Sequence, residues 1–487
     1  MKLTDIIQSE NPTEQINALQ GGRQHAIPDV ARGKKALDPK LHDINDPLIR
    51  KDKKVRVDAD DESDSAKKVI STDGEAVATR TEKVARIALA LQRLIINRAV
   101  SFCFGNPVEY NATPTDEQQE AVLKALKRIL SDVKTNSLNR KIGRAIFGFM
   151  ECAELWYPVE KEHNKYGFPS KFKLRCALFS PAFGDVLYPY FDDSGDMVAF
   201  SRAFSRKDNK GVSTDYFETY TDEEHWLWVV NANGAGAQVA EGFPKAVAIG
   251  KIPVIYGYQP KFETEDVDKL IDRLELLLSN FADTNDYHAS PKIFCTGTIN
   301  GWAKKGESGA VIEGEPGATM QYVSWANAPE AVKLEIETLL RLIYTITQTP
   351  DISFDSVKGL GAISGLALKL LFMDAHLKVQ DKREIFDDYL QRRANVLLAY
   401  IAQFNTQLAA ACDELEVEPE ITPYILTSEI DDLNYWMTAN GNKAVISQEE
   451  SIEKAGLSGN PQLTMEKIKE QTTAENSFLV GEPILDA

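Results

Sequence analysis

The sequence lacks both paired cysteines and a long uncharged apolar run. Its five cysteines are dispersed and form no C-x-x-C pair, so we expect reduced thiols and a reducing compartment. The most apolar long stretch, Val84 to Val100, contains three arginines, whereas a membrane-spanning helix needs about 18 or more residues with few charges. Met1 leads into polar residues instead of a signal peptide. These absences predict a soluble protein of the cytosol.

Positive charge is also scarce in this chain of 487 residues. Lys and Arg together number 55 against 73 Asp and Glu, which gives a formal net charge of -18. Wrapping DNA through counterion release needs clustered cations, so we do not expect this mode of DNA binding. A strongly acidic surface suits a protein that stays soluble among copies of itself, or one that repels a polyanion from most of its surface.

Phosphate-binding motifs are missing, although one stretch invites the comparison. The sequence from Thr349 to Leu371 places a glycine-bearing loop directly before an apolar helical pattern. A Walker A loop needs two glycines five positions apart, followed by Lys and then Ser or Thr, and neither Gly359 nor Gly361 meets this spacing. In the dinucleotide fingerprint the third glycine would fall on Ser364. The sequence therefore does not predict a nucleotide site here.

Other catalytic constellations are absent as well. The six histidines lie far apart, and neither H-E-x-x-H nor G-x-S-x-G occurs. The carboxylates between Glu265 and Asp272 favour a solvated helix face over an acid/base pair. We therefore expect no catalytic residue, no cofactor and no metal site. The alternative is a nucleotide-dependent soluble enzyme that uses a pocket formed by Gly359–Gly365 and the carboxylate-rich helices.

Hydrophobic periodicity divides the chain into an α+β series of elements. Residues 1–80 are the least globular part of the chain and are expected to be a partly flexible arm. Within them Gly33–Lys68 is charge-dense and poor in aromatics, which is typical of a segment that orders only against a neighbour; a solvated tail with no role is the alternative. The elements expected after it are helices at Thr81–Val100 and Asp116–Thr135, strands between Gly148 and Tyr256 with a hairpin turn at Asp192–Gly195, and helices at Glu265–Asp286, Pro329–Gln348 and Gly365–Asp413. The last helix would be about 70 Å long, too long for one globular core.

Several stretches resemble, in the same order, those of the SPP1-type phage portal proteins. They are INRAVSFCFGNPVEYN from Ile96, AIGKIPVIYGYQP from Ala248, the acidic helix from Glu265, the loop and long helix from Thr349 to Leu397, and ISQEESIEKAGLSGNPQLTMEKIKEQ from Ile446. Each pattern alone is weak, but their co-linear order from Thr81 to Gln471 is specific. The first eighty residues lie outside the resemblance.

The resemblance implies the portal fold, in which subunits with a wing, stem, clip and crown form a ring. The implied segments are an N-terminal arm (1–80), a wing of helices and a β-rich body (81–260), a first stem helix (261–289), the clip (290–327), a second stem helix (328–348), a tunnel loop (349–364), the long wing helix with its return strand (365–428), and the crown with the C-terminal tail (429–487).

The resemblance also implies three groups of functional residues. The tunnel loop would face a DNA channel with Asp351, Phe354, Asp355, Lys358, Gly359, Leu360, Gly361 and Ile363. The stem would line the channel with Asp268, Asp272, Glu275, Lys333 and Glu337, and the clip would contact a motor or adaptor with Trp302, Lys304 and Lys305. Lys358 is opposed by two aspartates, so the loop would attract phosphate little, and its glycines would give it mobility.

The function implied is that of a head–tail connector at one capsid vertex of a virion assembled in the bacterial cytoplasm. It would dock the terminase for DNA packaging and pass DNA during packaging and ejection. The implied partners are copies of the chain in a dodecameric ring, the terminase large subunit, a head–tail adaptor, the major capsid and scaffolding proteins, and double-stranded DNA without sequence specificity, with no membrane. A different ring-forming connector subunit is a further alternative.

Overall fold

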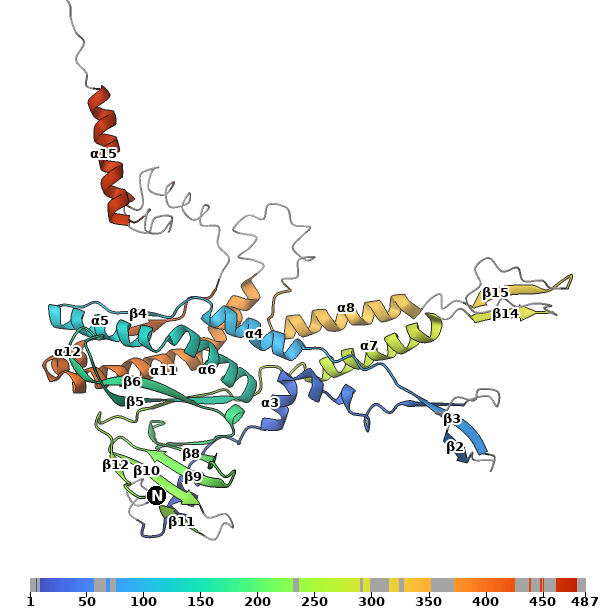
Figure 1. Cartoon of the computed structure of the whole chain (residues 1–487), viewed down its shortest axis with the longest axis horizontal. Coiled ribbons are helices and arrows are strands. Elements are labelled where there is room, and N and C mark those ends of the chain that lie inside the picture. The colour runs from blue at the N-terminus through green and yellow to red at the C-terminus, as the bar shows by residue number, and fades with distance from the viewer. Residues whose placement is uncertain are drawn as a thin grey trace, which may run out of the picture. The chain divides into compact units, whose positions relative to one another are not determined.

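The computed structural model describes residues 6, 9–56, 67–70, 76–230, 236–289, 292–297, 315–323, 328–351, 372–424, 438, 447–448, 450 and 461–479. Contacts divide the chain into two units. Unit 1 comprises Met1–Ser353 and Met373–Tyr424, and unit 2 comprises Phe354–Phe372 and Ile425–Ala487. Helices and sheets are mixed in unit 1 (Figure 1), which confirms the α+β expectation.

A helical layer forms the centre of unit 1. Its members are α4 (Leu91–Phe104), α5 (Glu117–Asp132), α6 (Thr135–Phe149), α11 (Met373–Phe404) and the short α12 (Ala409–Glu414). Helix α5 begins where Asp116 Oδ1 accepts a hydrogen bond from Gln119 N at 2.7 Å. Its apolar stripe buries Val122, Leu126 and Ile129 completely. This helix confirms the element predicted at Asp116–Thr135.

Two sheets form the β-rich body that the sequence predicts. A three-stranded antiparallel sheet in the order β13-β5-β6 packs against α11, and a six-stranded sheet runs β11-β10-β9-β8-β7, with β12 paired to β10. The bounds are β5 (Glu151–His163), β6 (Ser170–Phe179), η3 (Pro181–Phe183), β7 (Val186–Phe191), β8 (Met197–Lys207), β9 (Ser213–Tyr220), β10 (Glu224–Val230), β11 (Ala237–Val239), β12 (Lys245–Ala246) and β13 (Val254–Tyr258). The predicted turn at Asp192–Gly195 joins β7 to β8, with Gly195 at φ 91°.

A fully buried ion pair ties α11 to the three-stranded sheet. Arg393 Nε donates to Glu154 Oε1 at 2.6 Å, and both side chains have 0% exposure. The same guanidinium donates from NH1 to Asn139 Oδ1 of α6 at 2.7 Å. Burial alone would lower the pKa of Arg393, but the charge of Glu154 outweighs it and holds the pKa well above its ordinary value. The side chain of Arg393 therefore joins α11, the three-stranded sheet and α6.

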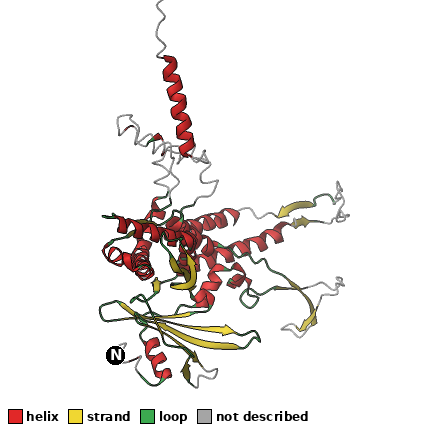
Figure 2. Ribbon diagram, turned by 60° about the vertical axis from the view of Figure 1, so that its left-hand side comes forward, coloured by secondary structure: helices red, strands yellow, loops and turns green. Residues whose placement is uncertain are grey.

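The first residues were expected to belong to an arm that orders only against a neighbour. The described ones instead pack on the body of the same chain. Helix α2 (Pro12–Gly21) lies on the six-stranded sheet (Figure 2), where Leu19 is fully buried. Trp228 Nε1 donates to Gln15 Oε1 at 3.1 Å. Arg23 forms a buried ion pair with Glu151 at 2.9 Å. These apolar and charged anchors are few in a polar stretch, which explains why composition alone suggested flexibility.

After these anchors the chain leaves the six-stranded sheet and forms one helix, two short turns and a small sheet. Helix α3 (Val30–Leu37) contacts α4 and α6, and the turns η1 (Pro39–Leu41) and η2 (Asp43–Asn45) follow. A three-stranded sheet in the order β1-β3-β2 comes next, built from β1 (Lys53–Arg56), β2 (Lys67–Ile70) and β3 (Ala76–Glu82). The predicted arm therefore contains defined helices and strands of its own.

Two predicted helices have different bounds in the structure. The helix expected at Thr81–Val100 begins only at Leu91, because the preceding residues are extended and bond to side chains of another helix. The long helix expected to reach Asp413 ends at Phe404, because Asn405 is extended and caps η4 (Thr406–Leu408) by accepting from Gln407 N. Its predicted start at Gly365 lies outside the described residues. A helix of 32 residues measures about 48 Å.

The remaining elements complete each unit. Helices α7 (Asp268–Ala289) and α8 (Ala328–Ile346) confirm the helices predicted at Glu265–Asp286 and Pro329–Gln348. Strands β14 (Lys292–Thr296) and β15 (Thr319–Val323) form an antiparallel pair between them, and β16 (Glu418–Glu420) pairs with β4 (Glu109–Asn111). In unit 2 the structure describes helix α15 (Pro461–Leu479).

Candidate functional site

Helices α7 and α8 form a pair that carries the five predicted channel residues of the stem. They lie side by side (Figure 1) and run in opposite directions, because the antiparallel β14–β15 pair connects them. The apolar core between α4, α7 and α8 is made of Leu91, Ile95, Val267, Ile271, Leu274, Leu277, Leu339 and Ile343. At the surface, Arg273 and Glu335 join the two helices at 2.8 Å. This core explains the apolar stripes that the sequence shows.

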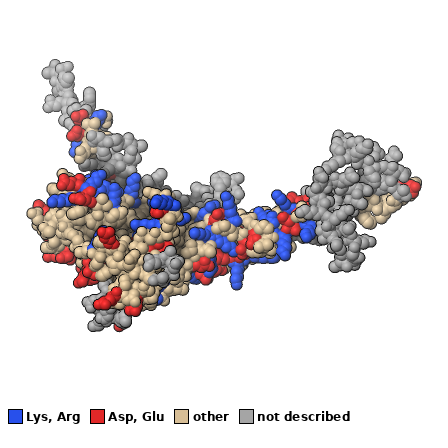
Figure 3. All heavy atoms as spheres, turned by 60° about the horizontal axis from the view of Figure 1, so that its bottom comes forward, with Lys and Arg blue, Asp and Glu red and all other residues tan. Residues whose placement is uncertain are grey.

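Helix α8 has two exposed faces of different character. Leu334, Leu342 and Ile346 remain 66%, 41% and 47% exposed, and their spacing of eight and four positions places them on one stripe. Lys333 and Glu337 lie on another stripe and form an exposed ion pair at 3.7 Å. Figure 3 shows one face of the chain, on which basic and acidic side chains are interspersed. The apolar stripe therefore stays partly open to solvent among the described residues.

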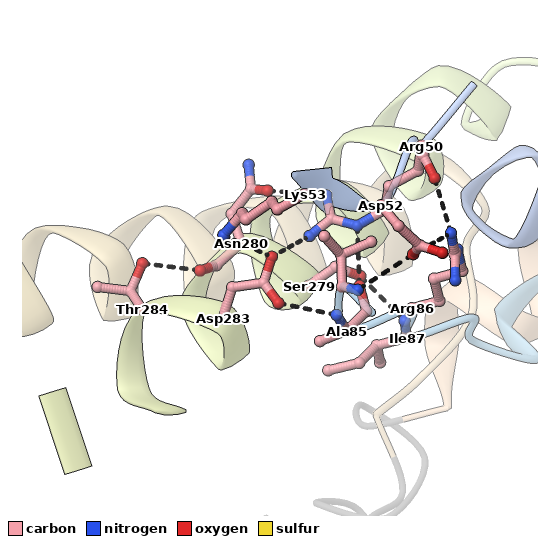
Figure 4. Close-up of polar contacts among 11 residues, drawn as sticks. Arg50, Asp52, Lys53, Ala85, Arg86, Ile87, Ser279, Asn280, Asp283 and Thr284 are labelled. Carbon is pink, nitrogen blue, oxygen red and sulfur yellow. Dashed lines mark hydrogen bonds and ion pairs between the residues drawn. The ribbon is translucent and has the colours of Figure 1, made fainter. Parts of the chain in front are cut away.

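A regular set of hydrogen bonds fixes an extended segment, residues 84–89, along α7. Backbone N–H groups at alternate positions of the segment donate to α7 side chains four positions apart (Figure 4). The pairs are Ala85 N to Asp283 Oδ1 (2.7 Å), Ile87 N to Ser279 Oγ (2.9 Å) and Leu89 N to Glu275 Oε1 (2.7 Å). We call this set the α7 ladder. Two strand residues rise about 6.7 Å and four helix residues about 6 Å, so the two periods nearly match.

Charged groups close the end of the α7 ladder at Asp283. Arg50 donates to Asp283 Oδ2 at 2.9 Å and to Ala85 O at 2.8 Å, and Arg86 pairs with Asp52 at 2.8 Å (Figure 4). Burial alone would raise the pKa of Asp283, but the hydrogen bond from Ala85 N and the charges of Lys53 and Arg50 outweigh it. The pKa of Asp283 is therefore held below its ordinary value.

The prediction that Glu275 lines a channel is wrong. Glu275 is 1% exposed and accepts hydrogen bonds within the chain, from Leu89 N at 2.7 Å and from His42 Nδ1 at 2.6 Å. The sequence pattern placed it with the solvated carboxylates because nothing in it indicates that residues 84–89 cover this side of α7. A buried carboxylate with two internal partners cannot contact DNA.

The other predicted stem residues reach the surface to different degrees. Asp272, Lys333 and Glu337 are exposed, whereas Asp268 is bound to Arg32 of α3 at 2.9 Å and its side chain is 24% exposed. The structure brings Asp268 and Asp272 onto one side of α7, one turn apart. It leaves Lys333 and Glu337 on the neighbouring helix. Their role as channel-lining residues stays a prediction.

The start of the predicted tunnel loop is anchored to the body. Lys378 Nζ donates to Thr347 O, just after α8, at 2.8 Å and pairs with Glu263 at 2.6 Å. Arg98 NH1 donates to Pro350 O at 2.6 Å. Burial alone would raise the pKa of Glu263, but Lys378 and Lys382 outweigh it and keep the pKa below its ordinary value. A cation at the carboxyl end of α8 also suits the helix dipole.

Most of the remaining predicted residues lie outside the described part of the chain. Asp351 is described and exposed. The residues outside are Phe354, Asp355, Lys358, Gly359, Leu360, Gly361 and Ile363 of the loop, and Trp302, Lys304 and Lys305 of the clip. Within the described residues, no group of His, Cys, Asp or Glu side chains is arranged to hold a metal ion. No described helix is both long and apolar enough to span a membrane.

The comparison with protein families decides the identity. The model for "Phage portal protein, SPP1 Gp6-like" matches residues 50–477, most of the chain. The chain belongs to this family. The portal protein is thus a structural component of the virion, as the resemblance implied, and the nucleotide-dependent enzyme gains no support. No curated protein matches it.

Solved structures similar to the portal protein come from gene transfer agent particles. The neck of an empty particle, computed with C6 symmetry, has a TM-score of 0.41 at 10% identity and covers 76% of this chain and 91% of the other. The neck of a native particle, computed with C12 symmetry, has a TM-score of 0.38 at 9% identity, with coverage of 76% and 90%. A virion of the native particle gives 0.36 at 10% identity, covering 76% and 89%.

Proposed function

We propose that this portal protein forms a ring at one capsid vertex, through which DNA enters and leaves the virion. The observation that carries the proposal, beside family membership, is the apolar stripe of α8. Leu334, Leu342 and Ile346 together expose a continuous apolar edge on a helix whose other side is already packed. A neighbouring copy that covers this edge would form a head-to-tail interface, which closes into a ring when the rotation between copies allows it.

The segments keep their proposed roles in this ring, with one change. The wing is residues 81–260 with 365–428, and it now includes the N-terminal residues packed on the β-rich body. The stem is 261–289 with 328–348, the clip is 290–327, the tunnel loop is 349–364 and the crown with the tail is 429–487. Asp268, Asp272, Lys333 and Glu337 would face the channel in the stem. Glu275 is removed from this set.

The partners follow from these segments. The clip would dock the terminase large subunit during packaging and a head–tail adaptor afterwards, through Trp302, Lys304 and Lys305. Major capsid and scaffolding proteins would contact the ring during assembly in the host cytoplasm. Double-stranded DNA would pass without sequence-specific contacts, which suits a mainly acidic surface. The portal protein would contribute structure, and the ATPase would belong to the separate motor.

Native mass tests the ring directly. The purified wild-type chain should elute near the mass of a dodecamer by light scattering and appear annular in negative stain. Replacing Leu334→Glu and Leu342→Glu should shift the protein to monomers, because two carboxylates would be buried without partners. The control, Lys333→Glu, makes the same change of two units in net charge on the neighbouring stripe and should keep the ring. Rings that persist in the leucine variant would reject the proposed interface, and a wild-type monomer would reject the ring.

Two further variants test the loop and the clip. Gly359→Pro with Gly361→Pro should leave the ring mass unchanged and impair DNA packaging, because proline restricts the loop backbone. Lys304→Glu with Lys305→Glu should weaken motor docking and also reduce packaging. Packaging at the wild-type level would reject the mechanical role of the loop in the first case. In the second case it would reject the clip contacts.

A further inference from the structure

Two neighbouring helices, α4 and α6, contain no acidic residue. No Asp or Glu occurs in Leu91–Phe104 or in Thr135–Phe149, although the chain has 73 of them. The helices pack closely, since a Cβ at Gly143 would lie 3.1 Å from the Phe104 ring. A paired helical surface without acids is unusual in a chain with a net charge of -18.

Four exposed cations lie together on this surface. Arg140, Lys141 and Arg144 are exposed on α6, and Arg93 is exposed on α4. Arg144 Nε contacts Asn97 Oδ1 at 3.4 Å, and Asn97 lies one turn from Arg93 on the same side of α4. These residues therefore border one seam between the helices. We call the four cations the α4–α6 face.

The charges around the α4–α6 face do not neutralise it. Within the described ranges, none of its four cations takes part in an ion pair closer than 4 Å. A hollow of about 650 Å³ beside the start of α6 adds Lys127 and Lys134, and Glu109 is the acidic residue that lines it. Because Glu109 lies at this border, we limit the inference to the four cations along the seam.

Helix α4 lies close to the carboxyl end of α8. Arg98, on α4, donates to Pro350 O at 2.6 Å, and its guanidinium carbon lies 5.8 Å from the centre of the Tyr344 ring. Pro350 directly precedes the residues proposed to enter the channel. If the proposed function holds, α4 is therefore among the elements of the body closest to the path of the DNA.

We propose that the α4–α6 face contacts the phosphate backbone of double-stranded DNA. The inference rests on the proposed function, and it adds a local attraction to a surface that repels a polyanion from most of its area. Phosphate contacts carry no sequence information and are weakened by salt. Four cations on long side chains release about four counterions, which gives contacts that exchange quickly while DNA slides past. The acidic remainder of the surface keeps the total attraction small.

DNA binding by the assembled ring tests this proposal. The test variant replaces Arg140→Gln, Lys141→Gln and Arg144→Gln. The control replaces Lys171→Gln, Lys207→Gln and Lys210→Gln, which are exposed cations on β6, on β8 and in the turn after β8 and cause the same change in net charge. Binding of a short fluorescein-labelled DNA duplex is measured by anisotropy over a series of salt concentrations, and ring mass is measured for every protein.

The α6 variant should bind DNA about tenfold more weakly at low salt, and its slope of log affinity against log salt should fall by roughly 2 to 3. The control should bind like the wild type. Equal losses in both variants would mean that net charge alone acts and would overturn the proposal. Wild-type affinity in the α6 variant, or absence of DNA binding by wild-type rings, would also overturn it while leaving the ring intact. Loss of the ring in the α6 variant alone would show that a neighbouring copy covers the face, and would overturn it too.

Discussion

The body and α7 both bury charged side chains, but α7 also uses the backbone of a second segment. In the body, Glu154 is paired with Arg393, and both side chains are fully buried. On α7, Glu275 and Asp283 accept from the backbone N–H groups of Leu89 and Ala85 as well as from the side chains of His42 and Arg50. The body therefore depends on a match between two ions, whereas α7 adds to its side-chain partners a match between two backbone repeats. The ion pair of the body should therefore be lost in a single step, whereas the hydrogen bonds of the α7 ladder should be lost one at a time.

The largest effect should come from breaking the buried ion pair of the body. Arg393→Met leaves Glu154 charged in a site without water and should lower the free energy of unfolding by about 3 to 5 kcal/mol. Urea unfolding followed by tryptophan fluorescence measures this, since Trp156 Nε1 donates to Glu154 Oε1 at 3.1 Å.

The double variant Arg393→Met with Glu154→Met is the control for this prediction. Replacing both ions by apolar groups of similar size should restore most of the lost stability, because no uncompensated charge remains. A double variant that is no more stable than the single one would contradict the explanation by charge pairing.

Acid should weaken the six-stranded sheet of the body through Glu218. Burial opposes its ionisation, but the hydrogen bond from His225 and the charge of Arg202 outweigh it and lower the pKa of Glu218 to about 2, from an ordinary value of 4.5. A depressed pKa stabilises the fold above pH 4.5, and this stabilisation is lost as the pH falls from 4.5 toward 2. Its full size is on the order of 3 kcal/mol.

Unfolding midpoints of wild type and Glu218→Gln, measured across this pH range, test the prediction. The wild type should lose more stability than the variant between pH 4.5 and the lowest pH at which rings remain soluble. Parallel curves would show that Glu218 does not contribute to the acid sensitivity.

The α7 ladder should respond locally. Glu275→Ala removes the acceptor for Leu89 N and for His42, and should cost about 2 to 3 kcal/mol, whereas Ser279→Ala should cost about 1 kcal/mol. Hydrogen exchange should accelerate most at the amide whose acceptor is removed and less at the other rungs. Glu275→Gln, which keeps an oxygen for Leu89 N, serves as the control. Uniform acceleration across unit 1 would contradict a ladder of separate rungs.

The smallest effect should come from the exposed ion pair between α7 and α8. Arg273→Ala removes the ion pair with Glu335, whose side chains are 50% and 40% exposed. Such pairs contribute about 0.5 kcal/mol or less, and less still at high salt. A shift in the unfolding midpoint as large as that of Glu275→Ala would mean that surface charges hold α7 and α8 together.

The sequence predicts helices and strands best where the apolar residues follow a single periodicity. The stripes of α5, α7 and α8 have helical spacing, so these helices are found with small errors at their ends. Residues 84–89 contain the same spacing but lie outside α4, because α7 side chains accept hydrogen bonds from three of their N–H groups. That choice depends on residues nearly two hundred positions away, which local patterns do not report.

The candidate functional residues divide in the same way, into those that local spacing predicts and those that depend on long-range contacts. Periodicity alone predicts the exposure of Asp272. The burial of Glu275 and the packing of Arg23 on Glu151 depend on long-range contacts. The acid-free surface of α4 and α6 is present in the sequence, but only the packing of the two helices brings its cations together. The net charge of the whole chain, -18, does not reveal this local group of cations.

The two repeats of the α7 ladder are nearly but not fully equal in length, and this difference limits how many rungs can form. Each step along the strand gains about 0.7 Å over the matching step along the helix, so three rungs stay in register and a much longer series would drift out of reach. The segment stops being extended where α4 begins at Leu91. A two-residue deletion in 84–89 should therefore shift the whole segment by one rung with its bonds kept, whereas a one-residue deletion would turn every N–H group away from α7.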